Sequence, residues 1–332
     1  MASGDLVVLR REGLYCPHGD FYIDPWRPVA RAVITHGHGD HARGGMGEYH
    51  VVREGLPILH WRLGTDCTYF DYAYGETFRL GDAVVSLHPA GHVLGSAQVR
   101  IEAAGQVWVA SGDYKRQHDP TCAPFEPVAC DTFITEATFG LPIYRWPDTA
   151  EVAREIVEWR DHCASRGEAA VLLCYALGKA QRVLAELAAW TDQPVLLHGA
   201  VQTGVDVYRG AGIHMVATRP VSEEEKGAEF AGQLVLAPPS AAGSTWMRRF
   251  RRSQLGFASG WMRVRGNRRR RNYDRGFVIS DHADWPDLLR TVRETGARRV
   301  IATHGNTDAL IRVLNDEGIA AEAFQTDFGG EE

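Results

Sequence analysis

Short apolar runs separated by glycine-containing turns dominate the first 140 residues. Alternating β-branched and aromatic residues predict strands at 31–35, 83–88, 97–102, 106–111 and 131–137. The segment EAAGQ between two of these runs predicts a hairpin turn. This part of the chain is therefore expected to be mainly β-structure.

The pattern changes after residue 145, where helical periodicity alternates with apolar strands. A helix is predicted from Asp148, which with Glu151 forms a capping box, to a stop at Gly167. Strands and helices then follow at 169–175, 179–190, 194–199, 277–280, 285–294, 298–305 and 307–318. Such alternation is typical of a parallel α/β unit, so the fold class is α/β.

Length and composition limit the kind of protein. The chain has 332 residues, 45% of them hydrophobic, which is enough for one large domain or two ordinary ones. No apolar run approaches the roughly 18 residues of a membrane helix, and no export signal is recognisable. We expect a cytoplasmic protein with no membrane partner. The six cysteines form no CxxC pair, so a metal site would depend on histidine and aspartate.

The net charge of −6 hides a strong asymmetry. Thr245–Arg275 contains eleven arginines and one acid, a net +10 that leaves −16 for the rest of the chain. A basic stripe on an acidic body indicates an anionic partner that meets one face. A solvated arginine-rich loop is the alternative.

The stretch VITHGHGDHARGG follows the strand predicted at 31–35. It places metal-binding side chains at His36, His38, Asp40 and His41. We expect the intervening glycines, Gly37 and Gly39, to let the backbone fold tightly. Neutral imidazoles and a carboxylate suit Zn²⁺ or Mn²⁺.

The four ligands of one loop cannot fill the coordination shells of two metal ions, so further ligands are expected downstream. Three candidates stand beside glycines where predicted strands end: His92, Asp113 and His304. Each alone is a weak signal, because a single histidine is more often a hydrogen-bonded structural residue. Their shared position strengthens all three.

This ligand series resembles that of the metallo-β-lactamase fold, an αββα sandwich with two metals at one edge. Later segments resemble the motifs of the β-CASP nuclease group. TEATFG, with Glu136, resembles motif A; ISDHAD, with His282, resembles motif B; and ATHGNT, with His304, resembles motif C. The segment YALGKAQRV resembles a strand-to-helix element of the same group. The resemblance covers about 24–306. It implies a metallo-β-lactamase domain in two parts, 1–145 and 276–332, and an inserted β-CASP α/β cap at 146–275.

The amino-terminal segment from Gly13 to Gly45 resembles the bacterial ligase-associated DNA exonucleases, which are encoded beside a DNA ligase and a helicase. His304 instead matches the RNA-cleaving branch of the group. We give the longer segment more weight. The interpretation is a DNA exonuclease of DNA repair acting on single strands or ends, with a ligase and a helicase as partners. An RNA-processing endo- or exonuclease and a small-molecule metallo-hydrolase are the alternatives.

The resemblance assigns roles to individual residues. His36, His38 and His92 would hold one divalent metal ion, Asp40, His41 and His304 the other, and Asp113 would bridge the two. Zn²⁺ is preferred and Mn²⁺ is the alternative. Asp24 would orient ligands by hydrogen bonds, unless it is only a turn aspartate before Pro25.

The implied reaction is in-line attack of metal-bound hydroxide on a phosphodiester, with Asp40 and Asp113 among the catalytic groups. His282 would be the general acid, because imidazole titrates near the working pH. Glu136 would hold His282 in place and keep it charged; a strand-end carboxylate is the alternative for Glu136.

Basic residues of the insertion are candidates for contact with nucleic acid. Lys179 follows Gly178 at a predicted helix start, where backbone N–H groups can meet a phosphate. The expected backbone-binding arginines are Arg248, Arg249, Arg251, Arg252, Arg268, Arg269, Arg270 and Arg271. The aromatic residues among or beside them that could stack on bases are Trp246, Phe250, Phe257 and Trp261.

Overall fold

The computed structural model describes residues 4–224, 229–266 and 272–324. The chain divides into two compact units. The first combines Met1–Tyr144 with His282–Glu332, and the second is Arg145–Asp281. In the sequence, the second unit is therefore an insertion into the first.

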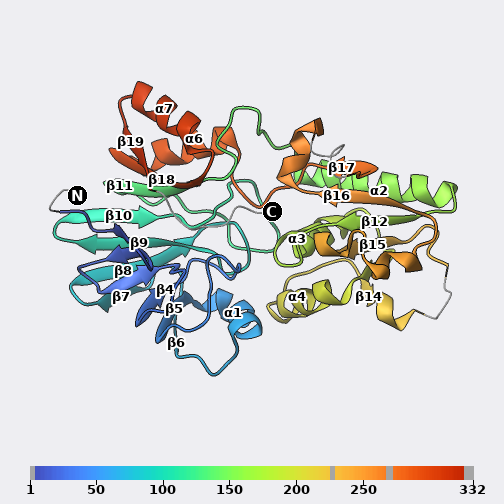
Figure 1. Ribbon diagram of the computed structural model, residues 1–332, viewed down its shortest axis with the longest axis horizontal. Coiled ribbons are helices and arrows are strands. Elements are labelled where there is room, and N and C mark those ends of the chain that lie inside the picture. The colour runs from blue at the N-terminus through green and yellow to red at the C-terminus, as the bar shows by residue number, and fades with distance from the viewer. Residues whose placement is uncertain (1–3, 225–228, 267–271, 325–332) are drawn as a thin grey trace. The chain divides into compact units, whose positions relative to one another are not determined.

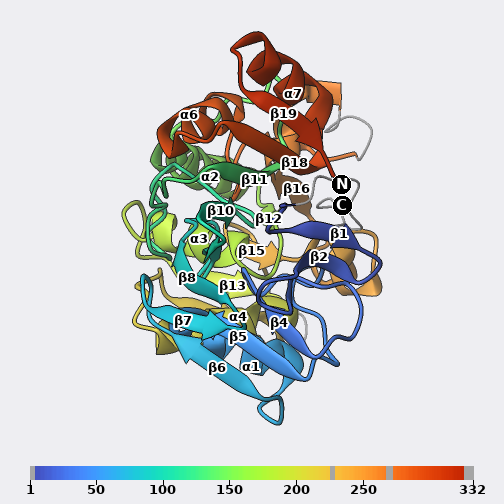
Figure 2. The ribbon, with the colours of Figure 1, turned by 90° about the vertical axis from the view of Figure 1, so that its left-hand side faces the viewer.

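In its described residues, the first unit has two β-sheets and three α-helices. Figures 1 and 2 show how they are arranged. One sheet has the order β1-β2-β3-β4-β5-β6, formed by Val8–Arg10, Gly13–Cys16, Phe21–Ile23, Arg31–Val33, Glu48–Val52 and Tyr69–Tyr72. The other has the order β19-β18-β11-β10-β9-β8-β7. Its strands are β7 (Thr77–Leu80), β8 (Ala83–Pro89), β9 (Ala97–Ala103), β10 (Gln106–Ala110), β11 (Thr132–Ala137), β18 (Arg299–Gly305) and β19 (Ala320–Ala323). The helices are α1 (Leu56–Leu63), α6 (Trp285–Thr295) and α7 (Thr307–Asp316).

Three separate hydrophobic cores show how these elements are layered. Phe21 and Val33 of the first sheet pack with Val99 and Trp108 of the second, so the two sheets face each other. On the outer face of the second sheet, core residues of β11 and β18 pack against α6 and α7. On the outer face of the first sheet, β4 and β5 pack against α1. Both views show α6 and α7 beside β18, and α1 beside β5 and β6 (Figures 1 and 2). This confirms the predicted αββα order.

The predicted hairpin turn joins β9 to β10. Its two central residues, Ala104 and Gly105, have left-handed φ angles of 49° and 73°. Because Ala103 pairs directly with Gln106, the loop has two residues. Left-handed conformation at both positions matches the twist of the flanking strands.

The second unit is built on a sheet whose described strand pairs are all parallel, in the order β14-β13-β15-β12-β16-β17. From β12 to β17 these strands are Ala169–Leu173, Val195–Leu197, Thr218–Pro220, Leu234–Ala237, Ser253–Ala258 and Arg275–Phe277. The α-helices with described bounds in this unit are α2 (Thr149–Ser165), α3 (Lys179–Leu187) and α4 (Gly199–Gly210). The strands β12, β13 and β15 are almost completely buried, as expected for a parallel sheet with both faces covered. The predicted parallel α/β unit is therefore confirmed.

Two local predictions are modified by the structure. Asp148 caps α2 as expected, but its side chain accepts from the Ala150 amide rather than from the third helical residue. The strand predicted at 277–280 ends at Phe277. Its last residues bend out of the sheet, with the Ile279 amide donating to the Phe277 carbonyl, because the chain leaves the second unit here.

None of the helices in the described part of the chain has both the length and the apolar character that crossing a bilayer requires.

Candidate metal centre

The histidine-rich loop is held at both ends by one buried aspartate. Asp24 follows β3 with a left-handed φ of 43°, and only 1% of its surface is exposed. One carboxylate oxygen accepts from the Thr35 amide at 2.7 Å, and the other lies 2.7 Å from His41 Nδ1. The Thr35 hydroxyl donates to that second oxygen as well. Asp24 therefore fixes where the loop begins and how the His41 ring is turned.

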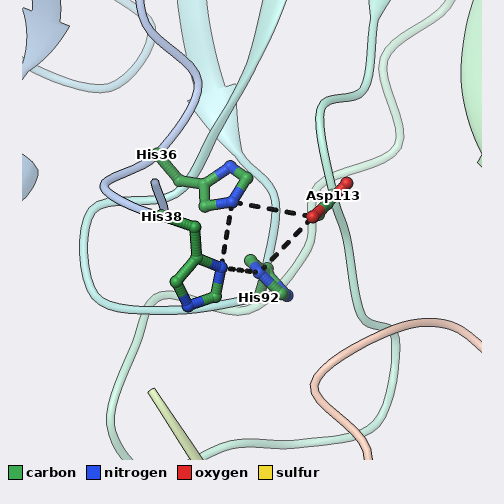
Figure 3. Close-up of side chains that lie close together, drawn as sticks. All are labelled: His36, His38, His92 and Asp113. Atoms are coloured by element: carbon green, nitrogen blue, oxygen red, sulfur yellow. Dashed lines mark hydrogen bonds and ion pairs between the residues drawn. The ribbon is translucent and has the colours of Figure 1, made fainter. Parts of the chain in front are cut away.

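Three histidines from two loops converge on one point (Figure 3). His38 Nδ1 lies 3.1 Å from His36 Nε2 and 3.0 Å from His92 Nε2. These nitrogens and a carboxylate oxygen of Asp113 all lie within 4.8 Å of one another. Each histidine offers one ring nitrogen to this group, and a neutral ring nitrogen that carries no proton has a lone pair for a metal ion. This is a donor set that fits a divalent cation such as Zn²⁺ or Mn²⁺.

Asp113 is the residue that the surrounding imidazoles share. Its Oδ2 lies 3.4 Å from His41 Nε2, 3.6 Å from His36 Nε2 and 3.8 Å from His92 Nε2. Its Oδ1 lies 3.1 Å from His304 Nε2. The two oxygens of one carboxylate thus face different histidines, which is the arrangement that a bridging ligand needs.

The second predicted group of ligands is less tightly gathered than the first. Asp40 Oδ2 lies 3.9 Å from His41 Nε2. The rings of His41 and His304 have centroids 6.2 Å apart, on either side of Asp113. His41 and His304 both face the Asp113 carboxylate, and Asp40 adjoins His41, but the three do not form as compact a set as the first group.

Two threonines that the sequence analysis missed orient the histidines that follow them. The Thr35 hydroxyl lies 3.0 Å from His36 Nδ1, and the Thr303 hydroxyl lies 2.9 Å from His304 Nδ1. Each bond leaves the Nε2 of its histidine facing Asp113. The signal was present in the sequence, because the tripeptide Thr-His-Gly occurs at both 35–37 and 303–305.

The glycines of the site have a role different from the one expected. Gly37 and Gly39 do not have left-handed φ angles; a Cβ at Gly37 would instead lie 2.4 Å from a side-chain carbon of Ile58. Left-handed conformation is found next to Asp113, where Gly112 has φ of 56° and a Cβ would lie 2.7 Å from the Thr35 side chain. Glycine is therefore required at Gly112 by both conformation and space.

Burial and charge set the protonation of the cluster. Burial lowers the pKa of His36 well below its ordinary value, and the neighbouring His41 and His92 lower it further. His36 is thus neutral, the form that binds a metal. Burial also opposes charge on His41 and Asp113, but their mutual attraction prevails: the pKa of His41 is raised and that of Asp113 is lowered.

A second buried pair adjoins the cluster. His282 Nδ1 lies 2.8 Å from Glu136 Oε2, and Glu136 Oε1 accepts from the Tyr114 amide at 2.7 Å. Ligand atoms of Asp113, Glu136 and His282 all lie within 4.8 Å of one another. Glu136 and His282 are at most 2% exposed. The pair expected from motifs A and B therefore reaches the edge of the histidine cluster.

Lys179 has a different partner from the phosphate that was expected. It is fully buried at the start of α3, with its Nζ 3.3 Å from Asp281 Oδ2. Arg182, one turn later and also fully buried, donates to the Ser280 carbonyl at 2.6 Å and to the hydroxyl of Thr149. These bonds join the start of α2 to the end of the second unit. We call Lys179, Arg182 and Asp281 the buried clasp.

The arginine-rich segment is exposed where it is described. Exposed members are Arg248, Arg249, Arg251 and Arg252, whereas Arg268, Arg269, Arg270 and Arg271 lie outside the described residues. Of the interleaved aromatics, Phe250 and Phe257 belong to the core of the second unit, and Trp246 and Trp261 are half-buried against it. The structure therefore does not present Phe250 or Phe257 to a base.

The chain has relatives among curated proteins, although no family model matches it. It is 31% identical over 318 residues to a probable DNA ligase of Opitutus terrae, a match to 95% of this chain and 31% of that protein. It is 27% identical over 194 residues to a ribonuclease of Thermus thermophilus, covering 50% of this chain and 44% of the relative. It is 34% identical over 115 residues to the cleavage and polyadenylation specificity factor 73 of Drosophila melanogaster, covering 32% of this chain and 16% of that protein. The chain thus spans less than half the length of each of these relatives.

A solved structure resembles the fold. A protein of unknown function from Enterococcus faecalis superposes with a TM-score of 0.57 at 11% identity, over 90% of this chain and 79% of that one. At this identity the likeness concerns the fold alone.

Replacing Asp24 by asparagine is expected to weaken Zn²⁺ binding about 10–100-fold, because an amide nitrogen cannot accept from Thr35 or face His41 as the carboxylate does. A competition titration against a chromophoric chelator measures this. The matched control is Asp20→Asn, since Asp20 also has a left-handed φ, of 48°, but is exposed. Equal zinc affinity in D24N and wild type would contradict the role of Asp24.

Removing the buried lysine is expected to destabilise the protein rather than to change nucleic-acid binding. Lys179→Met would remove the cation 3.3 Å from the buried Asp281 and leave Arg182 at 3.9 Å from its other oxygen, so the loss should lie below the cost of about 3–5 kcal/mol for an uncompensated buried charge. The double variant K179M/D281N should recover part of that loss. Chemical denaturation measures the stability. An unchanged denaturation midpoint in K179M would show that the clasp does not stabilise the second unit.

Proposed function

We propose that this chain, a homologue of the metallo-β-lactamase/β-CASP nucleases, is a metal-dependent phosphodiesterase that shortens DNA from an end. The relatives confirm the family resemblance drawn from the motifs. The activity rests on one observation: His36, His38 and His92 meet the Asp113 carboxylate beside the buried pair of His282 and Glu136.

The proposed ligands divide into two groups that share Asp113. His36, His38 and His92 would hold one divalent ion, and the looser set, Asp40, His41 and His304, would hold a second. Bound cations would polarise a phosphoryl oxygen and lower the pKa of water. The protein contributes the fixed ring orientations, through Asp24, Thr35 and Thr303, and a buried, weakly hydrated environment.

In the proposed reaction, His282 donates a proton to the oxygen of the departing strand. Its Nδ1 faces the Glu136 carboxylate at 2.8 Å, which favours the charged imidazolium and turns Nε2 away from Glu136. Glu136 is itself held by the Tyr114 amide, so the donor has little freedom to rotate. Asp113 and Asp40 cannot supply that proton, because an ionised carboxylate only accepts hydrogen bonds.

DNA as the substrate is supported by the longest sequence match. The relative that matches 95% of this chain is named a probable DNA ligase, and the matched region is about a third of it. A nuclease that trims ends would prepare substrates for such a ligase, so we propose a role in DNA repair with a ligase as functional partner. The predicted helicase partner has no comparable support.

RNA is the second candidate substrate. Two observations favour it: His304 occupies motif C, and several relatives matching a third to a half of this chain are named ribonucleases or endoribonucleases. Those matches are shorter than the match to the DNA ligase.

Matched DNA and RNA single strands, labelled at the 5′ or the 3′ end, are expected to separate these functions. We expect DNA to be shortened stepwise from one end with added Zn²⁺ or Mn²⁺, and turnover to be abolished by chelator. A preference for RNA by a wide margin would contradict the DNA assignment. Cleavage of small esters with no loss of either polymer would identify a small-molecule hydrolase instead.

Two substrates whose leaving groups differ in their need for a proton test the role of His282. His282→Ala should slow DNA cleavage about 10²–10⁴-fold, the usual contribution of a general acid. A p-nitrophenyl ester of thymidine phosphate has a leaving group that needs no protonation, so its hydrolysis should fall far less. His118→Ala, at an exposed histidine, is the control. Equal losses on both substrates would mean that His282 does not act as the acid.

A further inference from the structure

A cavity of about 490 Å³ lies within the second unit. Its polar lining is mainly basic, with Arg249, Arg251 and Arg252 against the single acid Glu229. The remaining lining residues are Gly167, Phe230, Ala231 and Phe250. A volume of this size is within the range that holds a nucleotide-sized ligand.

Among the described residues, no ion pair joins the cavity arginines Arg249, Arg251 and Arg252 to a carboxylate, a feature they share with exposed arginines such as Arg11 and Arg79. In the described parts of the chain, the guanidinium groups of Arg248, Arg249, Arg251 and Arg252 lie farther than 4.0 Å from every carboxylate. Several exposed arginines in other places are paired, with N–O distances of 2.6 Å for Arg53–Asp71, 2.5 Å for Arg154–Glu158 and 2.6 Å for Arg293–Glu317. Three positive charges against the one negative charge of Glu229 leave the lining net positive, which favours an anionic ligand.

Two of the arginines are held in place by the backbone. Arg249 donates one N–H to the Val221 carbonyl at 3.2 Å, and Arg252 donates one to the Arg166 carbonyl at 2.9 Å. Each guanidinium has five N–H donors, so most remain available. A side chain fixed in this way loses less entropy when it binds phosphate.

The cavity lies at one edge of the parallel sheet. Gly167, Ala231 and Arg252 come shortly before β12, β15 and β16, which are neighbours in the sheet, so they lie at the amino ends of these strands. The chain leaves the unit at Asp281, which pairs with Lys179 just after the carboxyl end of β12. The six residues of β16 separate the two edges by about 20 Å.

We propose that this cavity binds the phosphate backbone of a polynucleotide at a point distant from the bond that is cut. The proposal rests on the proposed nuclease function for the identity of the polymer. Within this unit the cavity lies at the edge of the sheet opposite to Asp281, the residue that directly precedes His282 in the chain. A long strand can reach the cavity while its end reacts, whereas a short oligonucleotide in the reaction site cannot reach it.

The test measures binding and hydrolysis separately. Fluorescence anisotropy in chelator, where no turnover occurs, would compare labelled single strands of 30 and 6 nucleotides, as DNA and as RNA. The variant is R249Q/R251Q/R252Q. The control, R290Q/R293Q/R298Q, removes the same charge from exposed arginines that are paired with acids.

We expect the cavity variant alone to weaken binding of the 30-mer and to leave the 6-mer unchanged. Three lost phosphate contacts should reduce the slope of log K against log salt by about 2 for a single strand. Hydrolysis of the thymidine p-nitrophenyl ester should be unaffected. DNA and RNA arms that respond alike would identify the shared backbone as the ligand.

Several results would overturn the proposal. These are an unchanged salt slope in the cavity variant, an equal loss in the control, or competition by inorganic phosphate as effective as that by the 30-mer. If the wild type and both variants all fail to hydrolyse DNA, while the cavity variant still binds the 30-mer more weakly, the proposed nuclease function is wrong and the proposed binding site is not. If the cavity variant cleaves and binds long strands as the wild type does, the proposed binding site is wrong and the proposed nuclease function is not.

Discussion

The attraction between the Asp113 carboxylate and the imidazoles around it is the constraint on which the rest of the first unit depends. Four histidines from three regions of the sequence approach its two oxygens within 3.1–3.8 Å. A buried carboxylate among neutral rings would be costly without compensating charge. The cost is offset by attraction between Asp113 and His41, which raises the pKa of His41 and lowers that of Asp113, and bound cations would offset it further.

The αββα sandwich explains how residues so far apart in sequence reach one carboxylate. His36, His92 and Asp113 each follow a strand of one of the facing sheets, and His304 lies near the end of β18. The strands are fixed by cores on both faces, so the loops that carry the ligands start from rigid positions. Short side-chain bonds from Asp24, Thr35 and Thr303 then set the rings.

Much of this arrangement could be predicted from the sequence, because it depends on local patterns. Strand alternation, the position of ligands beside glycines at strand ends and the resemblance to known motifs located the cluster and its pair Glu136–His282. Features that depend on tertiary contacts could not be predicted. The need for glycine at 112 arises from Thr35, far away in sequence. Lys179 has the local setting of a phosphate ligand, yet its partner Asp281 lies a hundred residues later. Likewise, burial of Phe250 and Phe257 against the sheet is not visible in an arginine-rich run.

The buried clasp has a consequence for evolution. By bonding to both Thr149 and Ser280, Arg182 holds the beginning and the end of the second unit together. A module whose two ends are adjacent can be inserted, exchanged or removed while the host sandwich keeps its own connectivity.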